Sequence, residues 1–261
     1  MSEWKVDSPE TIQFDETPTD LHVSMVAGEV ELAAGEGPAF LEVRQVSGPE
    51  LQVRLANGRL EIEQEPEHLS WGVNKVSASL TLQVPADCKV ELEAVSASVF
   101  ASGFAEDVRL KTVSGEITLE SLTGRTQATT VSGELNARGQ VGELRGETVS
   151  GDVTLDAYSA HSVRLQSVSG EVAADLQQAG SEASAELETV SGAVYLRLAS
   201  EPSQEVRVDS VSGRLVSSFP QLTAKSYPGS RTLKGTLGGG QGKVRVTTVS
   251  GAVSLLAEAS A

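Results

Sequence analysis

The tripeptide Val-Ser-Gly recurs at a nearly constant interval through most of this 261-residue chain, and no other feature constrains the fold as strongly. Intact copies begin at Val46, Val113, Val131, Val149, Val168, Val190, Val211 and Val249, and degenerate copies at Val26, Val76 and Val95. From Val76 to Val211 the spacing stays between 18 and 22 residues. The last interval is 38 residues, which predicts a masked copy at Tyr227-Pro228-Gly229. A period of this size indicates a repeat architecture.

Apolar and polar residues alternate on both sides of each tripeptide. Around one copy the apolar positions are Leu110 before it and Ile117 and Leu119 after it. Such alternation is typical of a β-strand with one buried face. The alternation shifts by one residue at Thr112-Val113, which we interpret as a corner where both residues face inward. The glycine then falls on the inner side of the second strand, where a Cβ would clash.

Short paired strands at this pitch predict an all-β parallel β-helix, or β-solenoid, with coils of about 18–22 residues. An antiparallel sandwich would explain the short strands but not one tripeptide at one pitch. We expect a single domain over residues 1–261. Residues 1–20 are predicted to form an N-terminal cap, 21–70 irregular acidic coils or hairpins, and 71–261 regular coils. A Gly- and Pro-rich segment, 219–242, is predicted to be a loop near the C-terminal cap.

The charge balance restricts the classes of partner. Lysine and arginine number 20 and aspartate and glutamate 36, so the net charge is −16. Nucleic acid and anionic membrane surfaces would repel such a chain. No apolar stretch approaches the length needed to cross a bilayer, so we expect no direct membrane insertion. We therefore expect a protein partner or self-association.

Two further features concern location and redox chemistry. No signal peptide is visible at the start of the sequence, which predicts a cytoplasmic location, with export by an unrecognised route as the alternative. Cys88 is the one cysteine, which excludes an intramolecular disulfide and a cysteine-based zinc site. It precedes an alternating strand, and we expect a small core residue rather than a reactive thiol.

The repeated unit Thr-Val-Ser-Gly-Glu/Asp-Val-x-Leu resembles the bacterial putative-adhesin β-strand repeat family. The lead-in Leu82-Gln83-Val84-Pro85-Ala86-Asp87 and a Gly-rich run before Thr248 are also similar to that family. The resemblance covers at least residues 76–255. It implies a β-helix of unknown function, no catalytic motif and an association with envelope or envelope-stress functions.

No catalytic or cofactor-binding residue is predicted. The run Gly235–Lys243 lacks the glycine and the Ser or Thr of a phosphate loop. The repeated serines have no recurring histidine to serve as a base. A polysaccharide-acting β-helix enzyme is the alternative, but the ten aromatic residues do not align on one repeat position. We therefore expect a protein that is not an enzyme.

A carboxylate follows several of the glycines and would form a ladder at close spacing. Its members are Glu29, Glu116, Glu134, Asp152 and Glu171. Stacked like charges repel, and a divalent cation would relieve the repulsion. The ladder is interrupted at Ala193, Arg214 and Ala252, and the Asp-rich repeat of calcium-binding rolls is absent. We therefore expect a solvated acidic edge rather than a metal site.

An outward position four residues before the valine is basic in most copies. It holds Arg109, Arg145, Arg164, Arg207 and Arg245. This row is the predicted interaction surface, although long arginine stems can also simply cover an exposed sheet. We expect a non-enzymatic protein-interaction scaffold, linked to envelope stress through the family resemblance. The alternatives are a self-assembling cytoskeletal-type solenoid, an exported surface adhesin and the β-helix enzyme.

Overall fold

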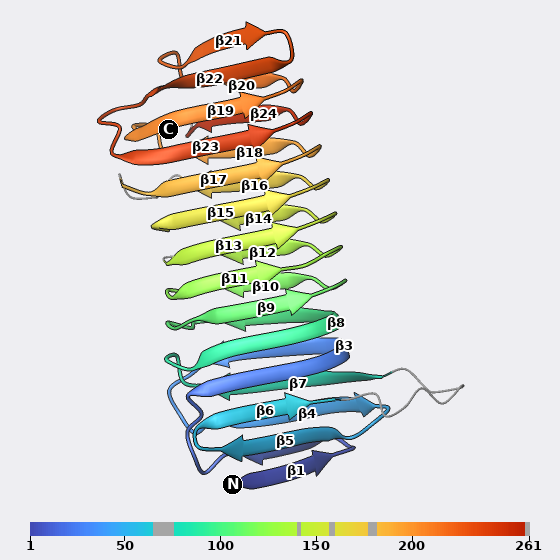
Figure 1. The fold of residues 1–261 in the computed structure, drawn as a ribbon. Helices are drawn as coiled ribbons and strands as arrows, with labels where there is room; N and C mark the ends of the chain where they lie inside the picture. Colours follow the sequence, from blue (N-terminus) through green and yellow to red (C-terminus); the bar gives the residue numbers. More distant parts are fainter. Residues whose placement is uncertain (65–75, 140–141, 157–159, 177–181, 259–261) are drawn as a thin grey trace. The chain divides into compact units, whose positions relative to one another are not determined.

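The computed structural model describes residues 1–64, 76–139, 142–156, 160–176 and 182–258 (Figure 1). These residues form 24 strands and no helix, so among them no helix could cross a membrane. The chain divides into two compact units, residues 1–130 (unit 1) and 131–261 (unit 2). The predicted all-β class is confirmed. The predicted division into one domain with a cap, irregular coils and regular coils stays a prediction.

Unit 2 is built from two ladders of paired strands. Ladder A runs in the order β13 (Glu143–Thr148), β15 (Ser162–Ser167), β17 (Ser184–Thr189), β23 (Gly242–Thr248), β19 (Gln204–Ser210), β22 (Ser230–Thr236) and β21 (Thr223–Tyr227). Ladder B runs β12 (Leu135–Arg138), β14 (Val153–Asp156), β16 (Val172–Leu176), β18 (Val194–Leu198), β24 (Val253–Ala257) and β20 (Leu215–Ser217). All pairs are parallel except β19–β22 and β21–β22.

The inner faces of the two ladders meet in an apolar core. A Cβ added to Gly146 on β13 would lie 2.5 Å from Leu135 Cδ2 on β12, which belongs to the other ladder. Alternate residues of each strand are buried, as the period-two pattern predicts. Equivalent residues of different coils lie side by side, for example Val153 beside Val172 and Val172 beside Val194. The solenoid-like, parallel-rich architecture predicted from the repeat is therefore confirmed.

The glycines of the tripeptide form the predicted column. The carbonyl oxygen of Gly133 occupies the place where a Cβ of Gly151 would lie, and the same relation recurs through the column. In space its order is Gly133, Gly151, Gly170, Gly192, Gly251 and Gly213. Glycine is required here because neighbouring backbones approach more closely than any side chain allows.

The order of the coils in space differs from their order in the sequence. Strand β23 lies between β17 and β19, and β24 lies between β18 and β20. The chain therefore skips one position, continues outward through β19 to β22, and returns to fill the gap. Figure 1 shows β23 between β17 and β19 in ladder A.

The masked copy predicted at Tyr227-Pro228-Gly229 is wrong. These residues form the turn of the antiparallel hairpin β21–β22, and Gly229 has a φ of 74°. The hairpin lies along β19, so antiparallel pairing replaces a further parallel coil at this position. An interval of two periods thus reflects a hairpin and a returning strand rather than a degenerate repeat.

The interpretation of the corner is also wrong in one respect. Thr112 is buried as predicted, but Val113 is 48% exposed, and Ser114 is exposed beside it. The two adjacent residues that break the alternation both face outward. In unit 2 the backbone N–H groups of Val149 and Ser150 both donate to Val131 O, which turns their two side chains away from the core.

The buried residue before each valine has a specific role that the sequence analysis missed. Thr148 Oγ1 accepts a hydrogen bond of 3.0 Å from the N–H of Gly151, and Ser167 Oγ accepts one of 2.9 Å from Gly170. A buried N–H without a partner would cost free energy. The recurring Thr or Ser thus satisfies the glycine N–H at five corners of unit 2, those of Gly151, Gly170, Gly192, Gly213 and Gly251.

Unit 1 also has two ladders, and two long strands belong to both. Its ladder A runs β1 (Ser2–Val6), β5 (Leu51–Ala56), β6 (Arg59–Glu63), β3 (Asp20–Ala34), β8 (Lys89–Ser102), β9 (Val108–Thr112) and β11 (Arg125–Thr129). Its ladder B runs β2 (Glu10–Gln13), β4 (Phe40–Ser47), β7 (Ser77–Val84), β3, β8 and β10 (Ile117–Glu120). The Asn57-Gly58 turn between β5 and β6 has positive φ at both residues, as short hairpins require.

Thr126 offers a test of the packing in unit 1. Its side chain is fully buried, and its hydroxyl has no hydrogen-bond partner. We expect Thr126→Val to raise the free energy of unfolding by about 1 kcal/mol, because it removes an unpaired buried hydroxyl. Thermal unfolding should show a Tm higher by roughly 2–4 °C. Thr130→Val is the matched control, since Thr130 Oγ1 donates to Gly115 O at 3.4 Å, and it should lower the Tm.

Cys88 is a core residue, as expected. Its side chain is fully buried, and burial together with the charges of Asp20 and Asp87 raises the thiol pKa to about 12. The folded protein therefore keeps the thiol proton above pH 9, where an unfolded chain would lose it. The free energy of unfolding should fall as the pH rises from about 9 toward 12, because the unfolded chain releases this proton more readily. We expect a thiol-reactive chromophore at about pH 8 to label Cys88 only in denaturant. Prompt labelling of the folded chain would contradict this environment.

Candidate interaction surface

The structure places the predicted arginines on the outer face of ladder A, one in unit 1 and four in unit 2. Arg145 and Arg164 are neighbours on β13 and β15, and Arg207 and Arg245 are neighbours on β19 and β23. Arg109 lies in unit 1, on β9, between Glu91 and Gln127. Four of the five predicted residues therefore share one ladder in unit 2, in two adjacent pairs.

In unit 2 these residues form a continuous row across six strands, called here the basic row. Its members in spatial order are Arg145, Arg164, Glu186, Arg245, Arg207 and Lys234. Lys234 was missed because β22 carries no tripeptide and runs antiparallel to β19. In the sequence, the apolar Leu233 followed by the charged Lys234 could have indicated that Lys234 faces outward, and the structure shows Leu233 buried and Lys234 exposed.

A second row lies beside the basic row and holds only acidic or neutral residues. Its members lie two residues further along each parallel strand and, on antiparallel β22, two residues before Lys234. Its members are Glu147, Gln166, Glu188, Thr247, Asp209 and Thr232. From the repeat pattern, the opposing carboxylates were expected on the second strand of each coil. The structure shows that residues two apart on the same strand face the same way, so the nearer carboxylates belong to the arginine strands themselves.

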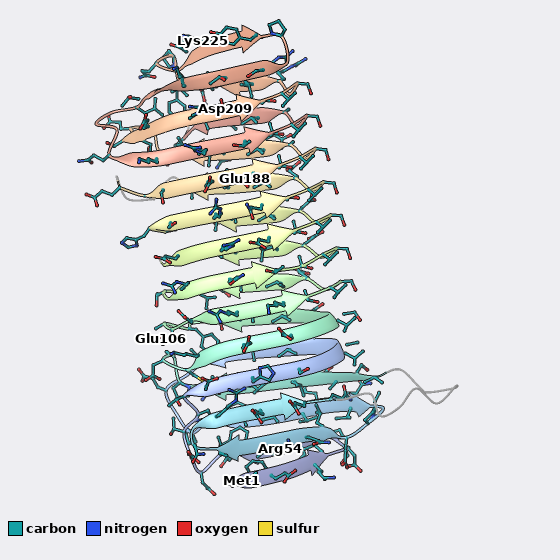
Figure 2. The ribbon with its side chains drawn as sticks, viewed as in Figure 1. Met1, Arg54, Glu106, Glu188, Asp209 and Lys225 are labelled. Carbon is teal, nitrogen blue, oxygen red and sulfur yellow. The ribbon has the colours of Figure 1, made fainter. Side chains whose placement is uncertain are left out.

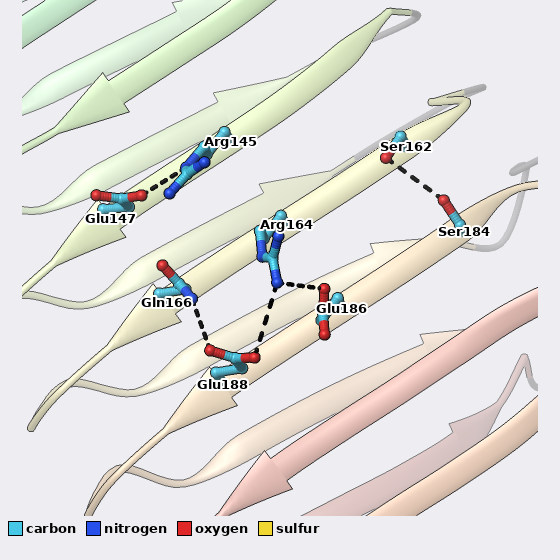
Figure 3. Close-up of polar contacts among 8 residues, drawn as sticks. All are labelled: Arg145, Glu147, Ser162, Arg164, Gln166, Ser184, Glu186 and Glu188. Atoms are coloured by element: carbon cyan, nitrogen blue, oxygen red, sulfur yellow. Dashed lines mark hydrogen bonds and ion pairs between the residues drawn. The ribbon is translucent and has the colours of Figure 1, made fainter.

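Several arginines of the basic row form ion pairs with carboxylates of the second row or with Glu186. Arg145 Nε lies 2.5 Å from Glu147 Oε1, and Arg164 Nη2 lies 2.7 Å from Glu186 Oε2 and 4.0 Å from Glu188 Oε1 (Figure 3). Gln166 Nε2 donates to Glu188 Oε2 at 2.6 Å. Exposed ion pairs of this kind contribute about 0.2–1 kcal/mol each, so the network can rearrange at low cost on contact with a partner.

Asp209 lies beside the outer end of the basic row, two residues beyond Arg207 on β19. It accepts hydrogen bonds from Arg207 Nε at 2.6 Å and from the Thr232 hydroxyl at 3.0 Å. Burial acts to raise the pKa of Asp209, but these hydrogen bonds and the charges of Arg207 and Arg245 outweigh it, so the pKa lies below its ordinary value. Asp209 is therefore ionised and engaged at neutral pH.

The predicted carboxylate ladder is partly engaged with the backbone. Asp152 Oδ1 accepts a hydrogen bond of 2.8 Å from the backbone N–H of Glu171, one coil further on. Within the described ranges no group of three or more His, Cys, Asp and Glu side chains is arranged to hold a metal ion. Asp152 thus helps to tie adjacent coils of ladder B together.

Ladder B of each unit carries a shallow hollow on its surface. The first, in unit 1, has a volume of about 410 Å³ and is lined by Glu29, Glu31 and Glu116 with the half-buried ring of Phe100. The second, in unit 2, measures about 270 Å³ and is lined in part by Tyr195, which pairs across strands with Ser254. The first is acidic, and the second is mixed.

The chain is similar to one family model and to several solved structures. A model described as Toastrack DUF4097 matches residues 101–184 and 147–256. A putative adhesin from Bacteroides fragilis is 10% identical with a TM-score of 0.50, and covers 96% of this chain and 97% of its own. A putative lipid binding protein from Parabacteroides distasonis is 12% identical with a TM-score of 0.44, over 97% of both chains. A putative cell adhesion protein from Clostridium sporogenes is 14% identical with a TM-score of 0.30, over 96% of this chain and 100% of its own. No curated protein matches.

Proposed function

Because the chain belongs to the Toastrack DUF4097 family, a domain of unknown function, we propose that it is a non-enzymatic β-solenoid that acts as a protein-interaction scaffold. The observation that carries the proposal is the basic row of unit 2 with the carboxylate row beside it. Ordered rows of opposite sign on a parallel ladder present charged side chains to a partner from regularly spaced backbone positions. The link to envelope stress belongs to the proposal through the family resemblance.

The proposal includes the finer architecture predicted from the repeat. Coils of 18–22 residues are supported by the register in unit 2, where Val153 pairs with Val172 and Val172 with Val194. The N-terminal cap over residues 1–20 completes this description. The predicted Gly- and Pro-rich loop over residues 219–242 is wrong, because most of this segment forms the antiparallel hairpin of β21 and β22. Ladder A of each unit ends in an antiparallel strand, β1 in unit 1 and β21 in unit 2, and these strands would protect the parallel edges behind them from unwanted pairing.

The scaffold proposal is tested by affinity capture of the full tagged chain from its native cell. A specific partner protein should be captured by the intact chain and lost with Arg145→Ala combined with Arg164→Ala. Arg197→Ala is the matched control, because Arg197 is also an exposed arginine in an ion pair, with Asp175 at 3.2 Å, but lies on ladder B. Retention of the partner by the double variant would contradict the assigned surface. Turnover of a glycan or ester, abolished by one substitution, would overturn the non-enzymatic proposal.

An exported surface adhesin is the second candidate. It is favoured by the adhesin description of the Bacteroides fragilis structure, whose likeness to this chain extends to the fold alone. Cell fractionation with antibody detection separates the two candidates. Protein found on the cell surface would favour the adhesin, and protein found only in the cytosol would exclude it. The location predicted from the sequence stays a prediction until then.

A further inference from the structure

The charges of this chain are strongly segregated. Residues 204–257 hold seven lysines and arginines but only two acidic residues, a net charge of +5 in a chain of net −16, which leaves −21 on the rest. These residues form β19 to β24 of unit 2. A basic region of this kind in an acidic protein is the most pronounced charge asymmetry in the sequence, and it coincides with one end of ladder A.

Three cations of this region stand side by side. The register places Arg207 on β19 directly between Arg245 on β23 and Lys234 on β22, and all three are exposed. Neighbouring strands are about 4.8 Å apart, so the three charges repel one another. Figure 2 shows Asp209 on β19 within this region and Lys225 on β21 at its edge.

The repulsion is only partly neutralised within the chain. Arg207 is engaged by Asp209. No side-chain hydrogen bond or ion pair from any described residue reaches Arg245 or Lys234. Lys225 has a separate explanation, because a lysine in an exposed edge strand blocks unwanted pairing. Asp209 thus acts on Arg245 without an ion pair, and both Arg245 and Lys234 can bind an anionic group of a partner.

Unit 1 supplies a surface of the required sign. Its 130 residues hold 22 acidic and 9 basic side chains, a net charge of −13. Its 410 Å³ hollow is lined by three glutamates and Phe100. Glu31 there is bound by Arg44 at 3.0 Å, whereas no described residue pairs with Glu29. A carboxylate beside an aromatic ring suits a guanidinium or ammonium group.

We propose that the basic surface formed by Arg245, Arg207 and Lys234 binds the acidic hollow in unit 1 of a second copy of this chain. This inference rests on the proposed interaction role and names a partner for the outer end of the basic row. A second copy is favoured over nucleic acid or an anionic membrane, because its hollow offers carboxylates beside an aromatic ring on a compact surface, whereas an extended polyanion would also meet the acidic remainder of the chain. Since the two surfaces differ, the contact is head-to-tail and propagates into a series of oligomers.

Sedimentation velocity of the full chain tests the inference, over protein concentrations from about 1 to about 100 µM. The mean mass should rise with concentration at about 20 mM salt and fall to that of the monomer at about 500 mM, because salt screens exposed charges. Lys234→Glu combined with Arg245→Glu should weaken self-association at least about ten-fold. Arg138→Glu combined with Arg197→Glu makes the same change in net charge on ladder B and should leave self-association unchanged. A monomer under all conditions would overturn the inference.

A charge swap gives the decisive result. Glu29→Lys combined with Glu116→Lys should abolish self-association of that variant alone. Mixing it with the Lys234→Glu, Arg245→Glu variant should restore oligomers, because each copy then offers a matched surface to the other. Circular dichroism and the Tm of each variant verify folding. Failure of the mixture to associate overturns the inference, and so does binding of monomers to anionic vesicles in place of oligomers. Either failure would leave the scaffold proposal standing if affinity capture yields a different protein.

Discussion

Replacing Gly170 with alanine is expected to lower the free energy of unfolding by at least about 3 kcal/mol. The added Cβ would lie well inside the 3.0 Å that real Cβ atoms keep, against the carbonyl oxygen of Gly151 in the neighbouring coil. Both groups belong to the backbone, so neither can rotate away. The coils would have to separate, which breaks parallel ladder hydrogen bonds on both sides of the corner. Chemical denaturation followed by circular dichroism measures the loss.

Gly146→Ala is the matched control for this prediction. Gly146 is also buried in unit 2, but its added Cβ would meet the ends of the side chains of Leu135 at 2.5 Å and Leu165 at 3.0 Å. Leucine side chains can change rotamer, and alanine lowers the conformational entropy of the unfolded chain relative to glycine. We expect a change within about 1.5 kcal/mol. Equal losses for the two variants would show that the glycine column is not set by backbone contact.

Val246→Pro is expected to destabilise the protein as much as a substitution in the middle of the solenoid, although only 15 residues of the sequence follow it. Val246 is fully buried in β23, between Leu187 on β17 and Val208 on β19. Proline removes a backbone donor and clashes with neighbouring backbone, so we expect a loss of at least about 3 kcal/mol. Hydrogen exchange should show lost protection in both flanking strands.

Thr223→Pro serves as the comparison for Val246→Pro. Thr223 is exposed at the start of β21, which pairs with β22 alone among the described strands. Proline is tolerated at the first residue of an edge strand, so the expected loss is below about 1 kcal/mol. Hydrogen exchange of the unmodified chain gives a second check, because β23 should be among the slowest strands of unit 2 and β21 among the fastest. The reverse order would contradict the insertion of β23.

The candidate surface was only partly predictable from the sequence. Four arginines of the basic row share one repeat position, so their outward orientation followed from the alternation of apolar residues. The position of Arg207 between Arg245 and Lys234 did not follow from it, because that position depends on the order in which the strands pair. The carboxylates Glu147 and Asp209 were within reach of the same period-two argument, since they lie two residues beyond an arginine on the same strand.

The corner shows how local pattern and tertiary geometry divide the information. The alternation of apolar and polar residues located a break at Thr112-Val113. It did not indicate whether the two adjacent residues that share a side at this break face the core or the solvent. The structure turns Val113 and Ser114 outward. Backbone hydrogen bonding to the neighbouring coil decides this orientation, together with the Thr or Ser hydroxyl that occupies the inner side.

The amino-acid order alone determined that this chain is all-β, that its strands repeat at one pitch, and that a glycine stands where backbones touch. These properties arise from local alternation and from the absence of a Cβ, which every coil carries in its own residues. The tertiary structure decided which coil lies beside which, and so brought Arg207, Arg245 and Lys234 together. Near-identical coils present near-identical edges, so local sequence leaves their order almost degenerate in energy. The hairpin β21–β22 and the returning strand β23 select one order through contacts between residues far apart in the chain.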